Sequence, residues 1–489
     1  MKKAALHNLG CKVNAYETEA MQQLLEQNGY EIVPFSEKAD VYVINTCSVT
    51  NIADRKSRQM LHRAKKLNPN SIVVAAGCYV QTSTEQAKAD EAIDILIGNN
   101  KKHELVELLA AFEQKRQREE QQQEEQQREE QQQEEQQQEE KQQEEKQQEE
   151  KQQEKKQQEE QQQEKNRQKQ DSIIDISGKT EYEEMALSRT AEHTRAFIKV
   201  QDGCNQFCSY CIIPYARGRV RSRDLGDVLE EVRRLAANGY REVVLTGIHL
   251  SSYGADTGEN LLRLIQKVHE IEGIRRIRLG SLEPKIVTEE FARELAALPK
   301  VCPHFHLSLQ SGCDATLKRM NRRYTCEEYR QGCNYLRKYF THPAITTDVI
   351  VGFPGETEEE FEMTRAFLKE IAFFEVHIFK YSKRQGTKAA AMEHQIPEET
   401  KTERSNILFE DTGRMSEEFV QWYQDKNVEV LMEEAMTEDG DRYFVGHTPE
   451  YVKAAVKVTD DLANRIVQGK VAGILKDHVL LMETIKNID

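Results

Sequence analysis

The segment from Glu113 to Gln170 most limits what this chain can fold into, because it consists almost entirely of Gln, Glu, Lys and Arg and contains no apolar side chain. Such a segment buries no apolar surface and cannot join a hydrophobic core. Its five-residue repeat fits neither the heptad nor the α-helical period, which excludes a coiled coil. We therefore expect a partly helical, otherwise disordered insert at residues 113–170 and a linker at 171–190.

The insert also accounts for the low mean hydropathy of −0.76. The net charge of −16 argues against a uniformly basic nucleic-acid binder, so any RNA contact must use local patches. No apolar run is long enough to cross a membrane, and the start Met1-Lys2-Lys3 lacks the apolar core of a signal peptide. These features lead us to expect a cytoplasmic protein with no membrane partner.

Residues 1–112 alternate short apolar runs with helical patterns, which is typical of a parallel α/β domain. The expected strands of this N-terminal domain are Ala4–Leu9, Val41–Ile44, Ile72–Ala76 and Ile93–Ile97. Residues 191–420 repeat a strand and a helix six times, which predicts an open (β/α) barrel with its chemistry at the C-terminal ends of the strands. The expected barrel strands are Ala196–Val200, Glu242–Thr246, Arg276–Gly280, Phe305–Gln310, Ile345–Val351 and Glu375–Tyr381.

The last region, residues 421–489, changes to short alternating stretches separated by polar turns. This pattern predicts a small antiparallel β-barrel. Barrels of this kind often bind oligonucleotides, although this region carries more acidic than basic side chains. The expected fold class is therefore α/β, with a third, all-β domain at the end of the chain.

Three closely spaced cysteines, Cys204, Cys208 and Cys211, form a C-x3-C-x2-C loop directly after the first expected barrel strand. Three thiolates on one short loop can ligate three irons of a cubane cluster and leave the fourth iron open to a substrate. A zinc site is the alternative, but four-thiolate zinc sites normally use two paired knuckles, and no second knuckle lies nearby. The spacing therefore predicts a [4Fe–4S] cluster.

Cys11, Cys47 and Cys78 lie far apart in the sequence, yet each follows an apolar run and precedes a helical segment. The ends of parallel strands meet at one edge of a sheet, so the three thiols can converge on a second cluster. The alternative is that they are three buried core thiols.

The motifs together resemble the radical-SAM methylthiotransferases. The resemblance rests on the loop from Gln201 to Arg219 and on five further motifs: Gly10-Cys-Lys-Val-Asn, Asn45-Thr-Cys, Gly77-Cys, Leu307-Ser-Leu-Gln-Ser-Gly and Asp348-Val-Ile-Val-Gly-Phe-Pro-Gly-Glu-Thr. The final barrel is similar to the family's RNA-binding TRAM domain. Gly10-Cys-Lys-Val-Asn-Ala-Tyr-Glu and Ala216-Arg-Gly-Arg-Val-Arg-Ser-Arg look most like the threonylcarbamoyladenosine tRNA branch. The Gln/Glu insert departs from the family pattern.

The resemblance implies an enzyme that adds a methylthio group to C2 of N6-threonylcarbamoyladenosine, 3′ to the anticodon of tRNA. It implies S-adenosylmethionine (SAM) as methyl donor and radical source, because abstraction of an unactivated hydrogen is beyond any side-chain base. The expected cofactors are two [4Fe–4S] clusters and SAM. The expected partners are the anticodon stem-loop of tRNA and a small electron donor of the flavodoxin or ferredoxin type.

The resemblance also implies roles for individual residues. Cys204, Cys208 and Cys211 would hold the SAM-binding cluster, and Cys11, Cys47 and Cys78 the auxiliary cluster that carries the sulfur. No side chain is expected to act as a catalytic acid or base. Candidates for SAM binding at the strand ends are Tyr210, Thr246, Gly247, Ser281, Glu283, Gln310 and Asp348. An extended segment would place Arg217, Arg219, Arg221 and Arg223 on one side as a phosphate-contacting stripe. We expect His249, His304 and His306 to be structural.

Two kinds of alternative remain. Within the same chemistry, the substrate is isopentenyladenosine in tRNA or a ribosomal protein. In a different class, the chain is a non-catalytic iron–sulfur electron carrier or an RNA-binding protein. The expected SAM-facing groups argue against an electron carrier, which needs no such pocket.

Overall fold

The structure is a computed structural model that describes residues 1–140, 169–178, 181–187, 189, 194–438, 440–458 and 460–487. The chain forms two compact units, which are described separately. Unit 1 comprises Met1–His7, Met21–Thr46 and Ser57–Ile174, and unit 2 comprises Asn8–Ala20, Cys47–Lys56 and Asp175–Asp489. None of the helices in the described ranges has the length and apolar character needed to cross a membrane.

Unit 1 is built on a six-stranded sheet in the order β2-β1-β3-β4-β5-β6. Its strands are β1 (Lys2–Asn8), β2 (Tyr30–Ile32), β3 (Val41–Thr46), β4 (Ile72–Gly77), β5 (Ile95–Ile97) and β6 (Gln170–Ser172). The pairs β1–β2, β3–β4, β4–β5 and β5–β6 are parallel. Every residue of β3 and β4 is buried, as expected for central strands covered on both faces. The parallel α/β prediction is confirmed.

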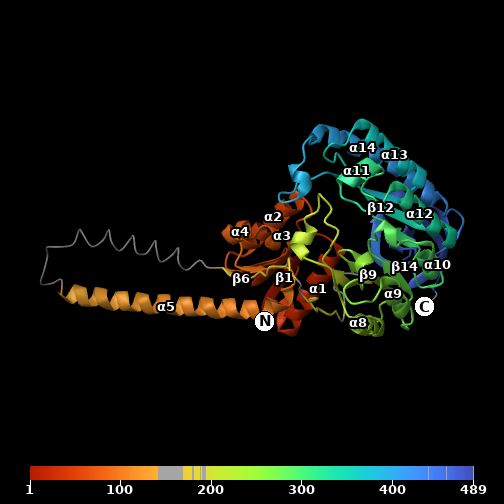
Figure 1. The fold of residues 1–489 in the computed structure, drawn as a ribbon. Coiled ribbons are helices and arrows are strands. Elements are labelled where there is room, and N and C mark those ends of the chain that lie inside the picture. Colours follow the sequence, from red (N-terminus) through yellow and green to blue (C-terminus); the bar gives the residue numbers. More distant parts are fainter. Residues whose placement is uncertain are drawn as a thin grey trace. The chain divides into compact units, whose positions relative to one another are not determined.

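The helices that begin in this region are α1 (Lys12–Gln27), α2 (Asn51–Leu67), α3 (Cys78–Thr82), α4 (Thr84–Ala89) and α5 (Leu105–Glu140). Helix α5 is the long orange helix in Figure 1 and carries the first part of the Gln/Glu tract. The rest of the predicted insert, up to residue 168, lies outside the described residues, as do several positions of the predicted linker 171–190. Beyond this region the chain returns to the sheet as β6, the strand at one edge.

Unit 2 contains an open barrel of six parallel strands, as predicted. Its strands are β7 (Arg195–Asp202), β9 (Glu242–Gly247), β10 (Arg276–Leu279), β11 (His304–His306), β12 (Ala344–Val351) and β13 (Glu375–Lys380), with the short antiparallel β8 (Arg221–Ser222) beside β7. They form two sheets, β10-β9-β7-β8 and β11-β12-β13. Single parallel bridges, Ile277 to Val301 and Leu282 to Leu307, join the two sheets.

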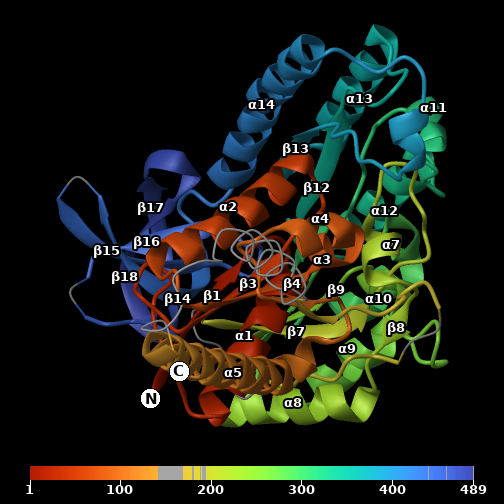
Figure 2. The same cartoon turned by 90° about the vertical axis from the view of Figure 1, so that its left-hand side faces the viewer.

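Helices cover the outer face of the barrel, and Figure 2 shows α13 and α14 on the side of β12 and β13. The main helices are α8 (Leu225–Ala237), α9 (Leu261–His269), α10 (Glu289–Ala296), α12 (Cys326–Tyr339), α13 (Glu358–Ile371) and α14 (Glu398–Gln421), with the short α7 (Ile213–Arg217) and α11 (Asp314–Arg319) between them. Capping boxes begin α12 at Thr325 and α13 at Thr357, so the local sequence fixes both starts.

Side chains alternate between the two faces of each barrel strand. One set, which includes Val243, Leu245, Ile277, Phe305 and Ile345, packs into a single hydrophobic core with the helices. The residues between them face the inside of the barrel, which we call the lumen. The lumen-facing residues used below are Arg195, Lys199, Gln201, Glu242, Thr246, Arg276, Arg278, His304, His306, Asp348 and His377.

The C-terminal region forms the predicted small barrel, closed in the order β14-β15-β16-β18-β17. Its strands are β14 (Asn427–Glu438), β15 (Asp441–His447), β16 (Lys453–Val456), β17 (Ile466–Ile474) and β18 (Leu480–Asn487). The turn after β15 is bound to the large barrel, because Arg278 donates hydrogen bonds to the carbonyls of Thr448 (3.3 Å) and Pro449 (2.8 Å). Tyr451, in the same turn, stacks on His304 at 4.9 Å between ring centroids.

Candidate active site

The cysteine loop begins where β7 ends, at the C-terminal edge of the barrel. Gly203 precedes Cys204 with φ of +70°, and a Cβ there would lie 1.8 Å from the carbonyl oxygen of Arg219, so only glycine fits. Cys204 donates its backbone N–H to the Gly218 carbonyl at 3.0 Å, and Cys211 to the Cys208 carbonyl at 3.0 Å. These bonds hold the loop that carries the three thiols.

The surroundings of the loop fit a metal cluster. Burial raises the pKa of Cys204 to about 11 and that of Cys211 to about 12. As metal ligands, these thiols would release their protons on binding. Arg322 donates from Nη1 to the Cys208 sulfur at 3.3 Å, and the backbone N–H of Gln206 donates to the Cys204 sulfur at 3.5 Å. Hydrogen bonds to sulfur are the outer contacts that stabilise thiolate-ligated iron.

A polar group lies beside this loop. Gln206 donates from Nε2 to Glu283 Oε2 at 3.1 Å, and His249 Nε2 lies 3.4 Å from the same oxygen. Burial raises the pKa of Glu283, but the contacts with His249 and Arg322 outweigh it and lower the pKa below its ordinary value. Glu283 is therefore a carboxylate at the mouth of the barrel, placed to accept hydrogen bonds from a bound ligand.

The other expected SAM-binding residues lie at strand ends of the same barrel. Thr246 is buried at the end of β9, and Gly247 lies so close to Gln201 that a Cβ would approach its side chain at 2.8 Å. Tyr210 is half-buried and packs edge-on to Phe353 at 6.4 Å. Ser281 follows β10 and is exposed.

Gln310 and Asp348 belong to the wall formed by β11 and β12. The backbone N–H of Gln310, at φ of +70°, donates to the Asp348 carbonyl at 2.8 Å. The Asp348 carboxylate lies 3.2 Å from His306 Nε2, and His306 Nδ1 lies 3.0 Å from the Thr346 hydroxyl. Potential ligand atoms of His306, Asp348 and His377 all lie within 4.8 Å of one another. His306 is thus a lumen residue that lies beside Asp348, an expected site residue.

Two of the dispersed cysteines, Cys11 and Cys47, lie close together in unit 2. A Cβ on Gly10, whose φ is +115°, would lie 3.0 Å from the Cβ and the sulfur of Cys47. Glycine therefore lets the Cys11 loop approach Cys47.

The third, Cys78, belongs to unit 1, where it is the first residue after β4. The last residues of β3 and β4, Thr46 and Gly77, are register partners, so Cys47 and Cys78 each follow one member of a strand pair. Asn99 donates from Nδ2 to the Cys78 sulfur at 3.5 Å. Each of the three cysteines thus follows a strand end, as the sequence predicts.

The expected arginine stripe is wrong for three of its four members. Arg217, Arg221 and Arg223 are buried, and only Arg219 is exposed. Arg221 interacts with Asp202, and Arg223 with Glu231. The segment is extended as expected at β8. However, its buried guanidinium groups pair with carboxylates of the protein and not, as we expected, with RNA phosphates. Arg219 stays a candidate for RNA contact, with its guanidinium 4.7 Å from the Phe207 ring centroid.

Arg217 is the centre of a buried ion network. It donates to Glu17 at 2.8 and 3.0 Å, to Asp202 at 3.1 and 3.2 Å and to Asn14 at 2.7 Å. Lys199 lies 2.7 Å from both Glu17 and Asp202. Although burial raises the pKa of Asp202, the neighbouring cations hold it well below its usual range. The network fixes the first part of α1, next to Cys11, against β7.

Lys12, the first residue of α1, directly follows Cys11, an expected cluster ligand. Its side chain is exposed, yet burial among protein atoms together with Arg278 and Arg195 lowers its pKa to about 8. No sequence signal separated Arg322 and His249 from ordinary polar residues, because their contacts with Cys208 and Glu283 depend on neighbours distant in the chain.

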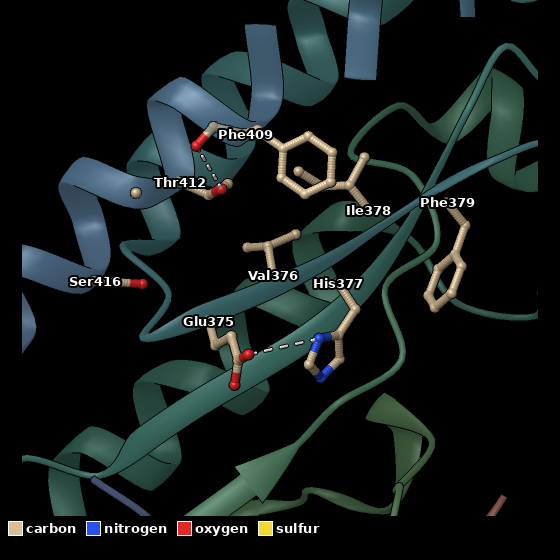
Figure 3. Close-up of a pocket in the computed structure, with 9 residues that line it drawn as sticks. Glu375, Val376, His377, Ile378, Phe379, Phe409, Thr412 and Ser416 are labelled. Atoms are coloured by element: carbon tan, nitrogen blue, oxygen red, sulfur yellow. Dashed lines mark hydrogen bonds and ion pairs between the residues drawn. The ribbon is translucent and has the colours of Figure 1, made fainter. Parts of the chain in front are cut away.

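A separate surface hollow lies between β13 and α14. It is lined by Glu375, Val376, His377, Ile378, Phe379, Phe409, Thr412, Gly413 and Ser416. Figure 3 shows His377 directed toward Glu375, 3.7 Å away along the same strand, with the α14 side chains opposite. None of the cysteines or expected SAM-binding residues lines it, so this hollow is distinct from the cluster loop.

This chain is similar to known proteins over most of its length. Residues 198–368 match the model of the Radical SAM superfamily, and residues 3–98 match that of the Uncharacterized protein family UPF0004. A threonylcarbamoyladenosine tRNA methylthiotransferase of Bacillus subtilis is 39% identical over 96% of this chain and 94% of its own length. The chain belongs to the radical-SAM methylthiotransferase family.

Other relatives in this family are named for two different tRNA substrates. The Aquifex aeolicus threonylcarbamoyladenosine tRNA methylthiotransferase is 38% identical over 88% of this chain and 92% of its own length. A tRNA-2-methylthio-N(6)-dimethylallyladenosine synthase of Acetivibrio thermocellus is 32% identical over 91% of this chain and 84% of its own length. Among solved structures, a radical SAM methyltransferase, TsrM of Kitasatospora setae, shares the fold, with a TM-score of 0.51, 14% identity and coverage of 78% and 75% of the two chains.

Proposed function

We propose that this enzyme methylthiolates C2 of N6-threonylcarbamoyladenosine, 3′ to the anticodon of tRNA. The observation that carries the proposal is the cysteine loop at the end of β7, with Arg322 donating to Cys208 and the Glu283 carboxylate beside it. The threonylcarbamoyladenosine relatives are 39% and 38% identical, against 32% for a dimethylallyladenosine relative, which favours the first substrate.

In this proposal Cys204, Cys208 and Cys211 hold the [4Fe–4S] cluster that binds SAM. When bound, the cluster and SAM supply the one-electron chemistry that abstracts the hydrogen from adenine C2. The chain's own residues position SAM at the barrel mouth. We assign this positioning to Tyr210, Thr246, Gly247, Ser281, Glu283, Gln310 and Asp348, and we add Gln206 and His249 because they contact Glu283.

We further propose that Cys11, Cys47 and Cys78 hold a second [4Fe–4S] cluster that carries the transferred sulfur. Support comes from their positions at strand ends and from the glycines that precede Cys11 and Cys78, each at positive φ. The glycine before Cys78 is also crowded, because a Cβ there would lie 2.6 Å from Asn45 Oδ1. Thiols that follow strand ends are the kind of ligand that such clusters use.

For the RNA, we propose that the C-terminal barrel and Arg219 contact the anticodon stem-loop. A small electron donor of the flavodoxin or ferredoxin type would reduce the cluster that binds SAM. Arg219 is an exposed arginine next to the cysteine loop, and small barrels of this architecture often bind oligonucleotides.

The deciding experiment is anaerobic reconstitution, followed by an iron count and mass spectrometry of tRNA nucleosides after incubation with SAM and a reductant. Two four-iron clusters predict about eight irons per chain, and the nucleoside expected is 2-methylthio-N6-threonylcarbamoyladenosine. Four irons would refute the second cluster. A methylthiolated isopentenyladenosine would move the substrate to the other tRNA branch, and no methylthiolated nucleoside would favour a non-catalytic iron–sulfur protein.

A further inference from the structure

Helix α2 (Asn51–Leu67) presents basic side chains to solvent along one side. Successive residues of an α-helix are about 100° apart around its axis, so the exposed residues between positions 52 and 66 all fall on that side. The opposite side is buried through Ser57, Leu61 and Ala64, and Asp54, the only acidic residue of the helix, does not lie on the exposed side. The exposed cations, which we call the basic face, are Arg55, Lys56, Arg63 and Lys66.

The charges of the basic face are not neutralised by carboxylates. None of its four residues forms an ion pair within the described part of the chain. Flanking residues of the same helix differ, because Lys65 pairs with Asp94 at 2.6 Å and His62 Nε2 lies 3.1 Å from the Asp90 carboxylate. In a chain with a net charge of −16, the basic face is therefore a local positive patch of the kind that binds polyanions.

The first turn of α2 is bound to the segment that follows β13, at the C-terminal edge of the large barrel. Asn51 donates from Nδ2 to the Lys383 carbonyl at 3.0 Å, and Arg384 donates to Asn51 Oδ1 at 2.9 Å. Arg384 also donates to the Asp54 carboxylate, whose other oxygen accepts from the Ser48 hydroxyl at 2.8 Å. These bonds fix the start of the basic face at the barrel edge that carries the cysteine loop.

We infer that the basic face of α2 binds the phosphate backbone of the RNA substrate. The inference rests on the proposed function. The reacting base would enter the barrel at the C-terminal ends of the strands, so the backbone next to that base lies at the edge where α2 begins. The basic face supplies phosphate contacts that the expected arginine stripe does not, because Arg217, Arg221 and Arg223 are buried. Phosphate contacts position an RNA without reading its sequence.

The arrangement of the charges favours a nucleic acid over an acidic protein such as the electron donor. The row from Arg55 to Lys66 is about 17 Å long at about 1.5 Å per residue, and no carboxylate interrupts it. Gln59 lies in the middle of the row, where its amide can donate a hydrogen bond to a phosphate oxygen. Rows of lysine and arginine neutralise successive phosphates, whereas lysine is depleted in protein–protein interfaces.

The test measures equilibrium binding of a synthetic anticodon stem-loop to the reconstituted enzyme, without reductant, over a range of salt concentrations. One variant replaces all four cations of the basic face with glutamine, which preserves helix propensity. Loss of four phosphate contacts should reduce the slope of log K against log salt by about 3. The decrease in affinity between about 50 and 200 mM salt should therefore become about 60-fold smaller than in the unsubstituted enzyme.

Matched variants separate the basic face from a general effect of charge. Arg233→Gln removes an exposed arginine from α8 and should leave the slope unchanged. Gln59→Glu keeps the four cations but adds a negative charge among them, so it should weaken binding, and Gln59→Lys should strengthen it. All these side chains are exposed, so each variant should keep the iron content and melting temperature of the unsubstituted enzyme.

Two results would overturn the inference while leaving the proposed function intact. One is an unchanged salt slope in the four-substituted variant. The other is unchanged RNA binding with product formation lost when reduced flavodoxin, but not dithionite, supplies the electrons, which would assign the basic face to the electron donor. The proposed function fails differently, because an unsubstituted enzyme that binds the stem-loop with the expected salt slope but forms no methylthiolated nucleoside would refute the activity and not the RNA contact.

Discussion

A substitution at Arg217 distinguishes most clearly between a structural role and an RNA-binding role for the buried arginines. Arg217→Met removes one of three cations, Lys199, Arg217 and Arg221, that compensate the buried carboxylates Glu17 and Asp202. Breaking a buried ion pair costs about 3 to 5 kcal/mol when it leaves a charge uncompensated. Two cations still face two carboxylates in the variant, so we expect the lower end of this range, about 3 kcal/mol.

The assay is thermal unfolding of the iron-free protein, with binding of an anticodon stem-loop as a second readout. A loss of about 3 kcal/mol lowers the melting temperature by about 6 °C or more at about 2 °C per kcal/mol. Arg219→Met is the matched control, because Arg219 lies two residues away and is exposed. It should leave stability within about 0.5 kcal/mol and reduce the salt dependence of RNA binding. Unchanged stability of Arg217→Met with weakened RNA binding would refute the burial argument.

Four further outcomes follow from the site. Cys208→Ser should reduce the iron content from about eight to about four per chain, because one cluster loses a ligand, and it should abolish product formation. Arg322→Met removes the hydrogen bond to the Cys208 sulfur, so the reduction potential of the cluster, followed by electron paramagnetic resonance during a redox titration, should become more negative. Arg278→Met leaves Glu242 with Arg276, at 3.7 Å, as its remaining ion pair among the described residues, and should lower stability in denaturant unfolding by about 3 kcal/mol. The pKa of Asp202 is depressed, so its contribution to stability is present above about pH 4 and lost below it; Asp202→Asn should flatten this acid dependence of the melting temperature.

The sequence predicts the strands well because buried parallel strands are continuous apolar runs, as in β3 and β4. It also places the cluster cysteines, since their spacing and their positions after strands are local properties. The sequence does not predict which carboxylate pairs with each buried arginine. The alternation of Arg217 and Arg221 indicates an extended segment, but their acceptors include Glu17, about two hundred residues earlier, and Asp202, on the preceding strand.

The same limit explains the residues that the sequence did not reveal. Arg322 reaches Cys208 from the segment between α11 and α12, and His249 meets Glu283 across two strand ends. Neither lies in a motif whose spacing indicates chemistry. Lumen residues such as Arg278 are recognisable only when the strands that surround them have been placed.

The turn from Thr448 to Tyr451 has a consequence for how this enzyme can be altered. Tyr451 lies between His304 and His447, at 4.9 and 4.5 Å between ring centroids, and the guanidinium carbons of Arg195 and Arg278 lie 4.8 and 4.7 Å from its ring centroid. The small barrel is therefore not a module that can be exchanged at its linker. A graft from another protein would leave Arg278 without its two carbonyl acceptors in the turn and Arg195 without Glu433 of β14, unless it carried both with it. A redesign of RNA preference therefore has to keep the residues of the small barrel that contact the large barrel and change strand residues elsewhere in the small barrel.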